Sequence, residues 1–291
     1  MKLLKGLEKI ARENEPVAGY TWFGIGGEAR YFFEPRTVEQ LQEVTRRCKE
    51  NKVPVFVLGA GSNILVPDSG IDGAVVKLAG DFENVEFVAN GVEVGAAVLI
   101  SGLVLNLIRE GRSGLEGLAG IPGSVGGCVR INAGGTFGDI GSAVKSVTVM
   151  NEDGDVFDRD REDLIFGYRT SNITARYILG ARFSLVEDDP KRIMNQVKKI
   201  WIYKKNTQPA GTRNSGCIFK NPRGMSAGAL IDKAGLKGRS IGGAKVSEKH
   251  ANFIVVDETA TAFDVLKLID LVRDEVAREF NVYLEKEIEV W

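Results

Sequence analysis

The sequence has few histidines, few cysteines and no long apolar run, and each of these absences argues against a class of protein. One histidine (His250) excludes a multi-histidine metal site. Three widely spaced cysteines (Cys48, Cys128 and Cys217) argue against a disulfide framework or a zinc ribbon. No apolar run approaches the about 20 residues of a membrane-spanning helix, and charges break every short apolar run near the N-terminus, which leaves no signal-peptide core. We therefore expect a cytoplasmic protein without membrane insertion, and the net charge of −1 gives no reason to expect a nucleic acid partner.

Glycine, in contrast, is abundant. The chain has 35 glycines in 291 residues, about 12 %, whereas roughly 7 % is average. They cluster between apolar runs instead of forming a linker, which indicates turns or a backbone that closely approaches something else.

The order of helical and strand-like patterns predicts an α+β fold. The first 60 residues are expected to form helix, strand, helix and strand, with Thr37 capping a helix through Cys48. A β-rich segment follows at 73–97. The later elements are a helix ending at Gly111, a hairpin at 144–158, a strand at 177–187, a basic helix from Pro190 to about Asn206, a short helix at 227–235, a strand at 251–256, a helix at 262–280 and a closing strand at 281–291. In the helix at 262–280 one apolar stripe is expected at helical spacing, made of Val265, Leu268, Ile269, Val272, Val276 and Phe280.

Three glycine-rich loops form the clearest candidate binding feature. "LGAGSN" (58–63) follows a strand-like run, and "GIPGSVGG" (120–127) and "NAGG" (132–135) come later. Successive backbone N–H groups in such loops can cradle phosphate. One loop alone is equally well explained as a tight turn, but three loops with few charges favour a large phosphate-bearing cofactor, a dinucleotide held by backbone donors. "GIGGEA" (24–29) is not a Rossmann fingerprint, because a strand-like RYFFEP follows it where a helix is required.

Longer motifs carry a resemblance to a known family. They are "TWFGIGGEARYFFEP", "LGAGSNILVPD", "GLAGIPGSVGG", "INAGG", "FGYRTS", "SGCIFKNP", "GALIDKAGLKGRSIGGAKVSEKHANFIV" and "LEKEIE". In this order they resemble the UDP-N-acetylenolpyruvoylglucosamine reductases (MurB), in the compact type. The resemblance implies an FAD-binding fold like that of the vanillyl-alcohol oxidases (PCMH type) over 1–190, with two subdomains that meet near residue 70. It also implies a substrate-binding α+β domain over 191–291.

The resemblance further implies an activity, its cofactors and its site. The activity is the NADPH-dependent reduction, through FAD, of UDP-N-acetylglucosamine enolpyruvate to UDP-N-acetylmuramate for peptidoglycan precursor synthesis, so the partners are NADPH and a UDP-sugar enolpyruvyl ether. The catalytic residues would be Arg169, Cys217 and Glu287, and Tyr168, Lys220 and Asn221 would contact the substrate. The FAD loops map onto Gly59, Ala60, Gly61, Ser62 and Asn63, and onto Ile121, Pro122, Gly123, Ser124 and Val125.

The side chains suit that chemistry. Hydride addition to the vinyl carbon leaves carbanion character beside a carboxylate, which a bidentate arginine such as Arg169 stabilises. A positioned acid then protonates the adjacent carbon, and a buried, protonated Glu287 can donate to an enolate oxygen. Cys217 stands where the family most often has serine. Its thiol, with a reference pKa of about 8.5, is a competent donor only while protonated, and a nearby Lys220 or Arg169 would favour the thiolate.

Simpler readings stay open for each residue. Cys217 can be a small apolar filler, Tyr168 a core residue, and Glu287 part of a solvated acidic face with Tyr283, Glu285 and Glu289. His250 is expected to be structural. Gly24 and Val256 depart from the family pattern, which often has a basic residue and an asparagine there. The rival functions are another flavin oxidoreductase, such as an alcohol or hydroxy-acid oxidase, and a non-catalytic flavin or UDP-sugar sensor.

Overall fold

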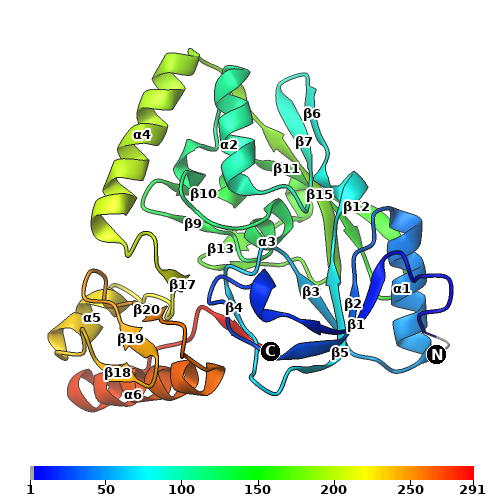
Figure 1. Ribbon diagram of the computed structural model, residues 1–291. Helices are drawn as coiled ribbons and strands as arrows, with labels where there is room; N and C mark the ends of the chain where they lie inside the picture. The colour runs from blue at the N-terminus through cyan, green and yellow to red at the C-terminus, as the bar shows by residue number, and fades with distance from the viewer. Residues whose placement is uncertain (1–2) are drawn as a thin grey trace. The chain divides into compact units, whose positions relative to one another are not determined.

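The computed structural model describes residues 3–291 and divides them into two compact units (Figure 1). Unit 1 contains residues 3–15, 30–60 and 72–202, and unit 2 contains residues 16–29, 61–71 and 203–291. Each unit is therefore assembled from segments far apart in the sequence.

Unit 1 is built on two sheets. The first has the strand order β1-β2-β5-β3 and pairs β3 with β5 in parallel, Val55 opposite Ala74. Its strands are β1 (Ala11–Pro16), β2 (Glu28–Phe33), β3 (Val55–Leu58) and β5 (Ile71–Lys77). Helix α1 (Val38–Glu50) connects β2 to β3 and buries Leu41, Val44 and Cys48. The strand β3 therefore delivers the first glycine loop directly from a sheet.

The second sheet is antiparallel, in the order β12-β11-β15-β7-β6, and Figure 1 shows these strands side by side. They are β6 (Val85–Val88), β7 (Gly91–Gly95), β11 (Val144–Met150), β12 (Val156–Asp160) and β15 (Tyr177–Ser184). Three further helices belong to this part of the chain: α2 (Ile100–Arg109), α3 (Val125–Arg130) and α4 (Pro190–Thr207). Three short strand pairs are also present: β8 (Arg112–Ser113) with β16 (Val186–Glu187), β9 (Gly134–Gly135) with β10 (Gly138–Asp139), and β13 (Phe166–Gly167) with β14 (Thr170–Ser171). Both sheets bury their apolar residues in one core.

The expected N-terminal helix is wrong. Leu3, Leu7 and Ile10 are buried with a helix-like spacing, but residues 3–10 form turns that lead into β1. Gly6 has φ +82°, which breaks a right-handed helix. The spacing of its apolar residues predicted a helix here, but this spacing is not sufficient to form one.

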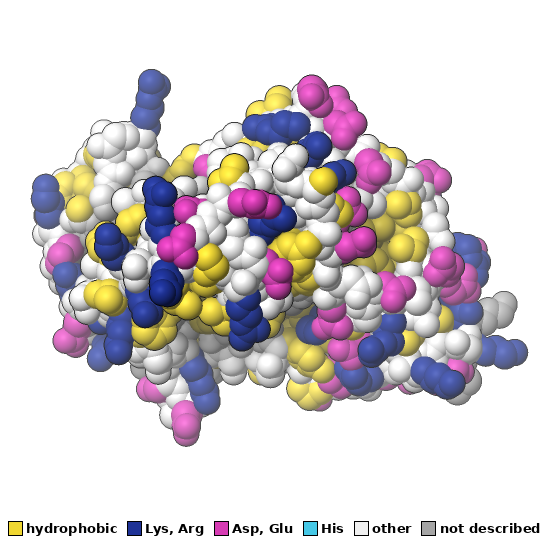
Figure 2. Space-filling view, turned by 90° about the horizontal axis from the view of Figure 1, so that it is seen from above, with side chains coloured by type: hydrophobic (Ala, Val, Ile, Leu, Met, Phe, Trp, Pro, Cys, Tyr) yellow, Lys and Arg dark blue, Asp and Glu magenta, His cyan; other side chains and the backbone are white. Residues whose placement is uncertain are grey.

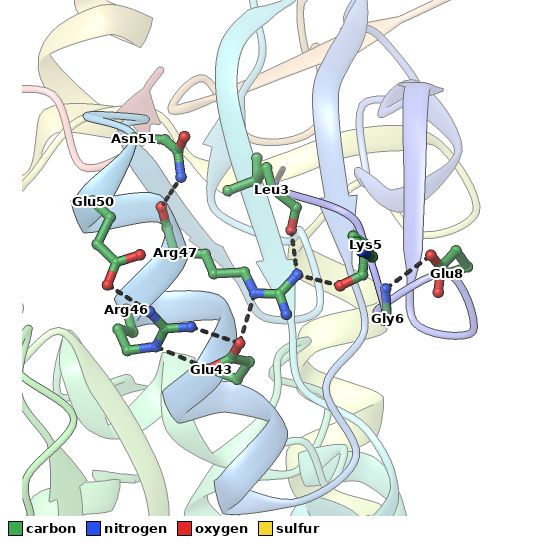
Figure 3. A network of polar contacts seen from close by, with 9 residues as sticks. All are labelled: Leu3, Lys5, Gly6, Glu8, Glu43, Arg46, Arg47, Glu50 and Asn51. Atoms are coloured by element: carbon green, nitrogen blue, oxygen red, sulfur yellow. Dashed lines mark hydrogen bonds and ion pairs between the residues drawn. The ribbon is translucent and has the colours of Figure 1, made fainter. Parts of the chain in front are cut away.

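A polar network ties these turns to α1 (Figure 3). The Arg47 guanidinium donates to the Leu3 and Lys5 carbonyls at 3.0 and 2.5 Å, and its Nε lies 2.7 Å from Glu43 Oε1. Arg46 also donates to Glu43, and the two arginines lower the pKa of this carboxyl to about 2. The predicted start of α1 is confirmed, because the Thr37 side chain accepts from the Gln40 N–H.

Unit 2 holds a four-stranded antiparallel sheet in the order β17-β20-β19-β18. Its strands are β17 (Arg213–Cys217), β18 (Ser240–Ile241), β19 (Ala244–Val246) and β20 (Phe253–Val256). Helices α5 (Ala227–Lys233) and α6 (Ala262–Phe280) bury their apolar faces in the same core, which also contains Phe23, Ile25 and Leu65. The predicted apolar stripe of α6 is confirmed at every buried position from Val265 to Val276.

The segment 61–71 is held in unit 2 by specific contacts. Strand β4 (Ile64–Leu65) pairs in parallel with β21 (Glu289–Val290), and the Asp68 carboxylate accepts the first N–H groups of α6, from Ala262 at 2.8 Å and Phe263 at 3.0 Å. A carboxylate at a helix N-terminus satisfies free donors and complements the helix dipole.

Two further expectations can be judged here. The predicted strand over 281–291 is too long, because only Glu289–Val290 is a strand and residues 283–288 are irregular apart from a bridge at Lys286. The rejection of a Rossmann fingerprint at 24–29 is confirmed, since β2 follows it.

No helix within residues 3–291 is long and apolar enough to cross a membrane, and Figure 2 shows charged side chains of both signs over the face in view. The predicted division into 1–190 and 191–291, with a subdomain boundary near 70, stays a prediction.

Candidate active site

Three carbonyl groups of the first glycine loop accept hydrogen bonds from the protein. Gly61 O accepts from Trp22 N at 2.9 Å, Ser62 O from Ser215 Oγ at 2.9 Å, and Asn63 O from Glu289 N at 2.9 Å. Among residues 3–291, the backbone N–H groups of Gly59, Ala60 and Gly61 donate to no acceptor. The loop therefore has three N–H donors that no acceptor in the described part of the chain uses, the feature that an anion-binding loop requires.

Glycine is required at position 61 of this loop. Its φ is +65°, and a Cβ there would lie 1.9 Å from Tyr20 O. Any larger residue would collide with a backbone that cannot move aside. The close packing fixes the conformation that presents the donors.

The second glycine loop has the same property. Gly123 O accepts from Ile100 N at 3.0 Å, and the N–H groups of Val125 and Gly126 reach Val98 O and Ala96 O at 2.8 and 2.9 Å. Among the described residues, the N–H groups of Gly123 and Ser124 donate to no acceptor. Ser124 is the N-cap of α3, and its Oγ accepts from Gly127 N at 3.4 Å.

Unit 1 brings these two loops together. A Cβ on Gly59 would lie 2.7 Å from Ser124 Oγ and 4.0 Å from Gly127 Cα. Residues about 65 positions apart in the sequence thus form one cradle of backbone donors with no acidic side chain in either loop. A diphosphate fits this donor set, since it needs many N–H donors and no competing negative charge.

The third glycine loop has a different role from the one the sequence pattern indicates. Asn132 donates to Gly167 O at 2.9 Å and accepts from Gly141 N at 2.9 Å, with φ +46°. Its side chain therefore anchors the β13–β14 hairpin instead of leaving an open cradle. Ser171 Oγ adds a bond to Arg130 O at 2.7 Å.

The β13–β14 hairpin carries Tyr168 and Arg169 at its turn. Arg169 has φ +56°, a strained conformation for a residue other than glycine. Its guanidinium carbon lies 5.4 Å from the centre of the Tyr168 ring, a cation–π contact, and 55 % of Tyr168 is exposed. The idea that Tyr168 is a core residue is therefore wrong. A strained, charged turn held by a buried asparagine is typical of a functional position.

The Cys217 segment is fixed by another buried asparagine. A register shift lies between Asn214 and Cys217 in the pairing of β17 with β20. Immediately beyond it, Asn252 Oδ1 accepts from Phe219 N at 3.0 Å, its Nδ2 donates to Phe219 O at 2.7 Å, and its backbone O accepts from Ile218 N at 2.8 Å. Cys217 is thus placed at the end of a strand whose continuation is clamped.

Unit 2 also brings Glu287 beside this segment. Glu287 N donates to Ile218 O and Lys220 N donates to Glu285 O, both at 2.8 Å, with a bridge between Phe219 and Lys286. Asn63 Nδ2 reaches Glu287 O at 3.1 Å. Glu287 is half-buried, whereas Glu285 and Glu289 are exposed, so it is set apart from the expected acidic face.

The two predicted substrate contacts next to Cys217 have local partners. Lys220 Nζ lies 2.5 Å from Glu285 Oε1, and Asn221 Oδ1 accepts from Ala227 N at 3.0 Å at the start of α5. Asn221 therefore has a structural contact as well as a predicted binding role.

The three cysteines differ in their surroundings. Cys48 and Cys128 are buried, and burial raises the pKa of Cys48 to about 11 and that of Cys128 to about 12, the charge of Arg169 opposing the shift at Cys128. Cys217 is half-buried. Cys217 is therefore the one of the three cysteines that is partly exposed and open to reaction.

Sequence reasoning missed Asn252 and the anchoring role of Asn132. Both are buried polar residues inside motifs quoted above, "HANF" and "INAGG". A polar side chain within an otherwise apolar stretch was the available signal, since buried amides are retained when they bind backbone.

Comparisons with known proteins match both the N-terminal and the C-terminal part of the chain. A family model described as FAD binding domain matches residues 29–159, and one described as the C-terminal domain of UDP-N-acetylenolpyruvoylglucosamine reductase matches residues 208–291. The chain is an FAD-binding oxidoreductase.

Its relatives define the family. UDP-N-acetylenolpyruvoylglucosamine reductase of Alkaliphilus oremlandii is 38 % identical over 100 % of this chain and 98 % of its own, and that of Bacillus subtilis is 39 % identical over 95 % and 92 %. The chain belongs to the UDP-N-acetylenolpyruvoylglucosamine reductase (MurB) family, as the sequence motifs predicted.

Comparison with solved structures supports the same family. The Thermus caldophilus UDP-N-acetylenolpyruvylglucosamine reductase superposes with a TM-score of 0.83 at 39 % identity, covering 97 % of this chain and 98 % of that one. Phl p 4.0202, a glucose dehydrogenase, has a TM-score of 0.51 at 14 % identity over 98 % of this chain and 60 % of its own, which shows the fold alone. The predicted α+β fold with an FAD-binding region is confirmed.

Proposed function

We propose that the protein reduces UDP-N-acetylglucosamine enolpyruvate to UDP-N-acetylmuramate with electrons from NADPH, in the cytoplasm, for peptidoglycan precursor synthesis. Family membership over the whole chain supports the activity and the NADPH donor. The observation that carries the proposal for this chain is the clamped Cys217 segment with the Glu287 backbone bonded beside it.

The FAD is assigned to the two glycine loops. Gly59, Ala60, Gly61, Gly123 and Ser124 would donate backbone N–H groups to its diphosphate. The side chains of Ser62 and Asn63 and the apolar Ile121 and Pro122 would line the flavin-facing part, with Val125 fully buried in the core behind them. Bound FAD would accept hydride from NADPH and pass it to the terminal vinyl carbon of the substrate.

Arg169 is assigned to the substrate carboxylate. Hydride addition places negative charge on the carbon next to this carboxylate, and delocalisation moves the charge onto its oxygens. A guanidinium already held in position by its turn stabilises that charge without reorganising. The contact with Tyr168 restricts the guanidinium further. The tyrosine, next to Arg169 in the turn, would then also contact the substrate.

Cys217 is assigned the final proton transfer. Its S–H bond breaks as a C–H bond forms at the carbon bearing the carboxylate, and the thiolate recovers a proton from solvent before the next cycle. Glu287, in its protonated form, would donate a hydrogen bond to the enolate oxygen. Lys220 and Asn221 would contact the diphosphate or sugar.

The test is an anaerobic half-reaction. Protein reduced with NADPH is mixed with UDP-N-acetylglucosamine enolpyruvate in a stopped-flow instrument, and the return of oxidised flavin absorbance is followed. We expect rapid reoxidation with formation of UDP-N-acetylmuramate, and loss of this step after Cys217 is alkylated.

Two other outcomes would contradict parts of the proposal. Flavin that bleaches with NADPH but stays reduced with the substrate would favour a different flavin oxidoreductase. Full alkylation of Cys217 without loss of turnover would remove the thiol from the mechanism.

A further inference from the structure

Helix α4 carries an unusual concentration of positive charge. Its 18 residues include Lys191, Arg192, Lys198, Lys199, Lys204 and Lys205 and no acidic residue, so its net charge is +6 in a chain whose net charge is −1.

The same helix exposes three large apolar side chains in a row. Trp201, Ile202 and Tyr203 are 55 %, 57 % and 47 % exposed. The inner side of the helix buries Ile193 and Ile200, so the exposed residues are additional to its packing stripe. Single exposed apolar residues are ordinary on protein surfaces, but three consecutive ones on a helix are not.

Helical geometry arranges these residues as one surface. Lys198, Ile202 and Lys205 recur at i, i+4 and i+7 and share the outer face, while Trp201 and Tyr203 project about 100° to either side of Ile202. The outer face thus has an aliphatic residue at its crest, an aromatic residue on each flank, and lysines before and after it along the axis. We call residues 198–205 the basic-aromatic surface.

We propose that the basic-aromatic surface binds an anionic lipid bilayer peripherally. Isoleucine gains by entering the apolar boundary of a bilayer, tryptophan and tyrosine favour the headgroup level, and lysines are attracted to acidic headgroups. Each residue type on this face thus has a favourable place in such a membrane.

A nucleic acid or an acidic protein as the ligand would account for fewer of the residues on the basic-aromatic surface. Both would satisfy the lysines, and aromatic rings can stack on bases. The exposed Ile202 has neither charge nor a π-face and gains only from an apolar environment. The central position of Ile202 is what favours lipid.

The test is co-sedimentation of the full FAD-loaded protein with phosphatidylcholine vesicles, with or without phosphatidylglycerol. We expect binding only to the vesicles that contain phosphatidylglycerol, weakened by added salt because the attraction is largely electrostatic. The double variant Lys198→Gln/Lys199→Gln should bind about thirtyfold more weakly, about fivefold for each lysine. Ile202→Gln should weaken binding about tenfold through loss of apolar burial.

A matched control separates the surface from net charge. Lys9→Gln/Lys145→Gln removes the same two charges from exposed positions elsewhere in unit 1 and should bind as the parent does. Retained FAD absorbance would verify that each variant is folded.

A second measurement reports contact with the acyl chains. Vesicles containing brominated phosphatidylglycerol should quench tryptophan fluorescence in the parent, and Trp201→Phe should lose this quenching, although Trp22 and Trp291 remain. Parent protein that fails to bind the anionic vesicles overturns the proposal, as does equal weakening by the control pair. Binding to duplex DNA or polyglutamate without binding to vesicles would assign the surface to an acidic polymer instead.

Discussion

The two glycine loops and the Cys217 segment are stabilised in opposite ways. The loops depend on the absence of a side chain at Gly59, which lets them approach closely, and among the described residues several of their backbone N–H groups have no acceptor. The Cys217 segment works through what is present, because the two amide atoms of Asn252 clamp the Phe219 backbone. Adding atoms should therefore disrupt the glycine loops, whereas removing atoms should disrupt the Cys217 segment.

The largest expected effect comes from removing the Cys217 sulfur. Cys217→Ala should slow flavin reoxidation by substrate about 10²- to 10⁴-fold, the usual contribution of a positioned proton donor. Reduction of the flavin by NADPH should be unchanged, and Cys217→Ser, which keeps a donor, should recover much of the rate. Both steps are measured by stopped-flow absorbance. Equal reoxidation rates in the Ala variant and the parent would mean that Cys217 only fills space.

Removing the clamp should come next. Asn252→Ala leaves the Phe219 N–H and C=O buried without their partner, so the free energy of unfolding should fall by about 2 to 4 kcal/mol. Urea unfolding measures this loss. Asn206→Ala, at an exposed position of α4, should stay within about 0.5 kcal/mol of the parent. A similar small change for Asn252→Ala would show that the clamp contributes little.

Adding one methyl group tests the loops. In Gly59→Ala the new carbon would lie 2.7 Å from Ser124 Oγ, and such overpacking typically costs about 1 to 3 kcal/mol. We expect FAD to bind more weakly by a factor corresponding to that cost, measured by fluorescence titration of the apoprotein. Gly135→Ala, which meets no atom within 4 Å, is the control. Unchanged FAD affinity in Gly59→Ala would mean that the loops do not need their close approach.

The smallest expected effect concerns His250, beside the clamp. Its ring packs against Phe253 at 4.8 Å, its Nδ1 accepts from Asn252 N at 3.3 Å, and burial lowers its pKa from 6.5. The unfolded chain therefore takes up a proton at a higher pH than the folded protein does. This contribution to stability is intact above pH 6.5 and is lost as the pH falls from there through the lower folded pKa.

Because His250 is the single histidine, this pH dependence has one imidazole source. Unfolding midpoints between pH 5 and pH 8 should decline on the acidic side in the parent, and His250→Gln should flatten that decline. An equally steep decline in the variant would assign the pH dependence to other groups.

Features that depend on residues close together in the sequence could be predicted from it. The Thr37 cap of α1 and the apolar stripe of α6 depend on residues within a few positions of one another, and both were predicted. The N-terminal segment failed because Gly6 overrides its helical apolar spacing. The Asn252 clamp could not be predicted, because its partner Phe219 is 33 residues away and only the folded chain joins them. The family motifs predicted a functional role for the glycine loops and Cys217, but not the contacts that hold these segments in place.

The interleaving of the two units has a consequence for the time at which each can be completed during synthesis. Residues 16–29 and 61–71 leave the ribosome early, yet their partners in unit 2 begin at residue 203. Asn63 and the Glu287 carbonyl that it binds are 224 residues apart, which corresponds to a delay of about 10 to 45 s at usual elongation rates. Throughout that interval Phe23, Ile25 and Leu65 lack most of their core, so this chain is a candidate for chaperone protection while it is being made.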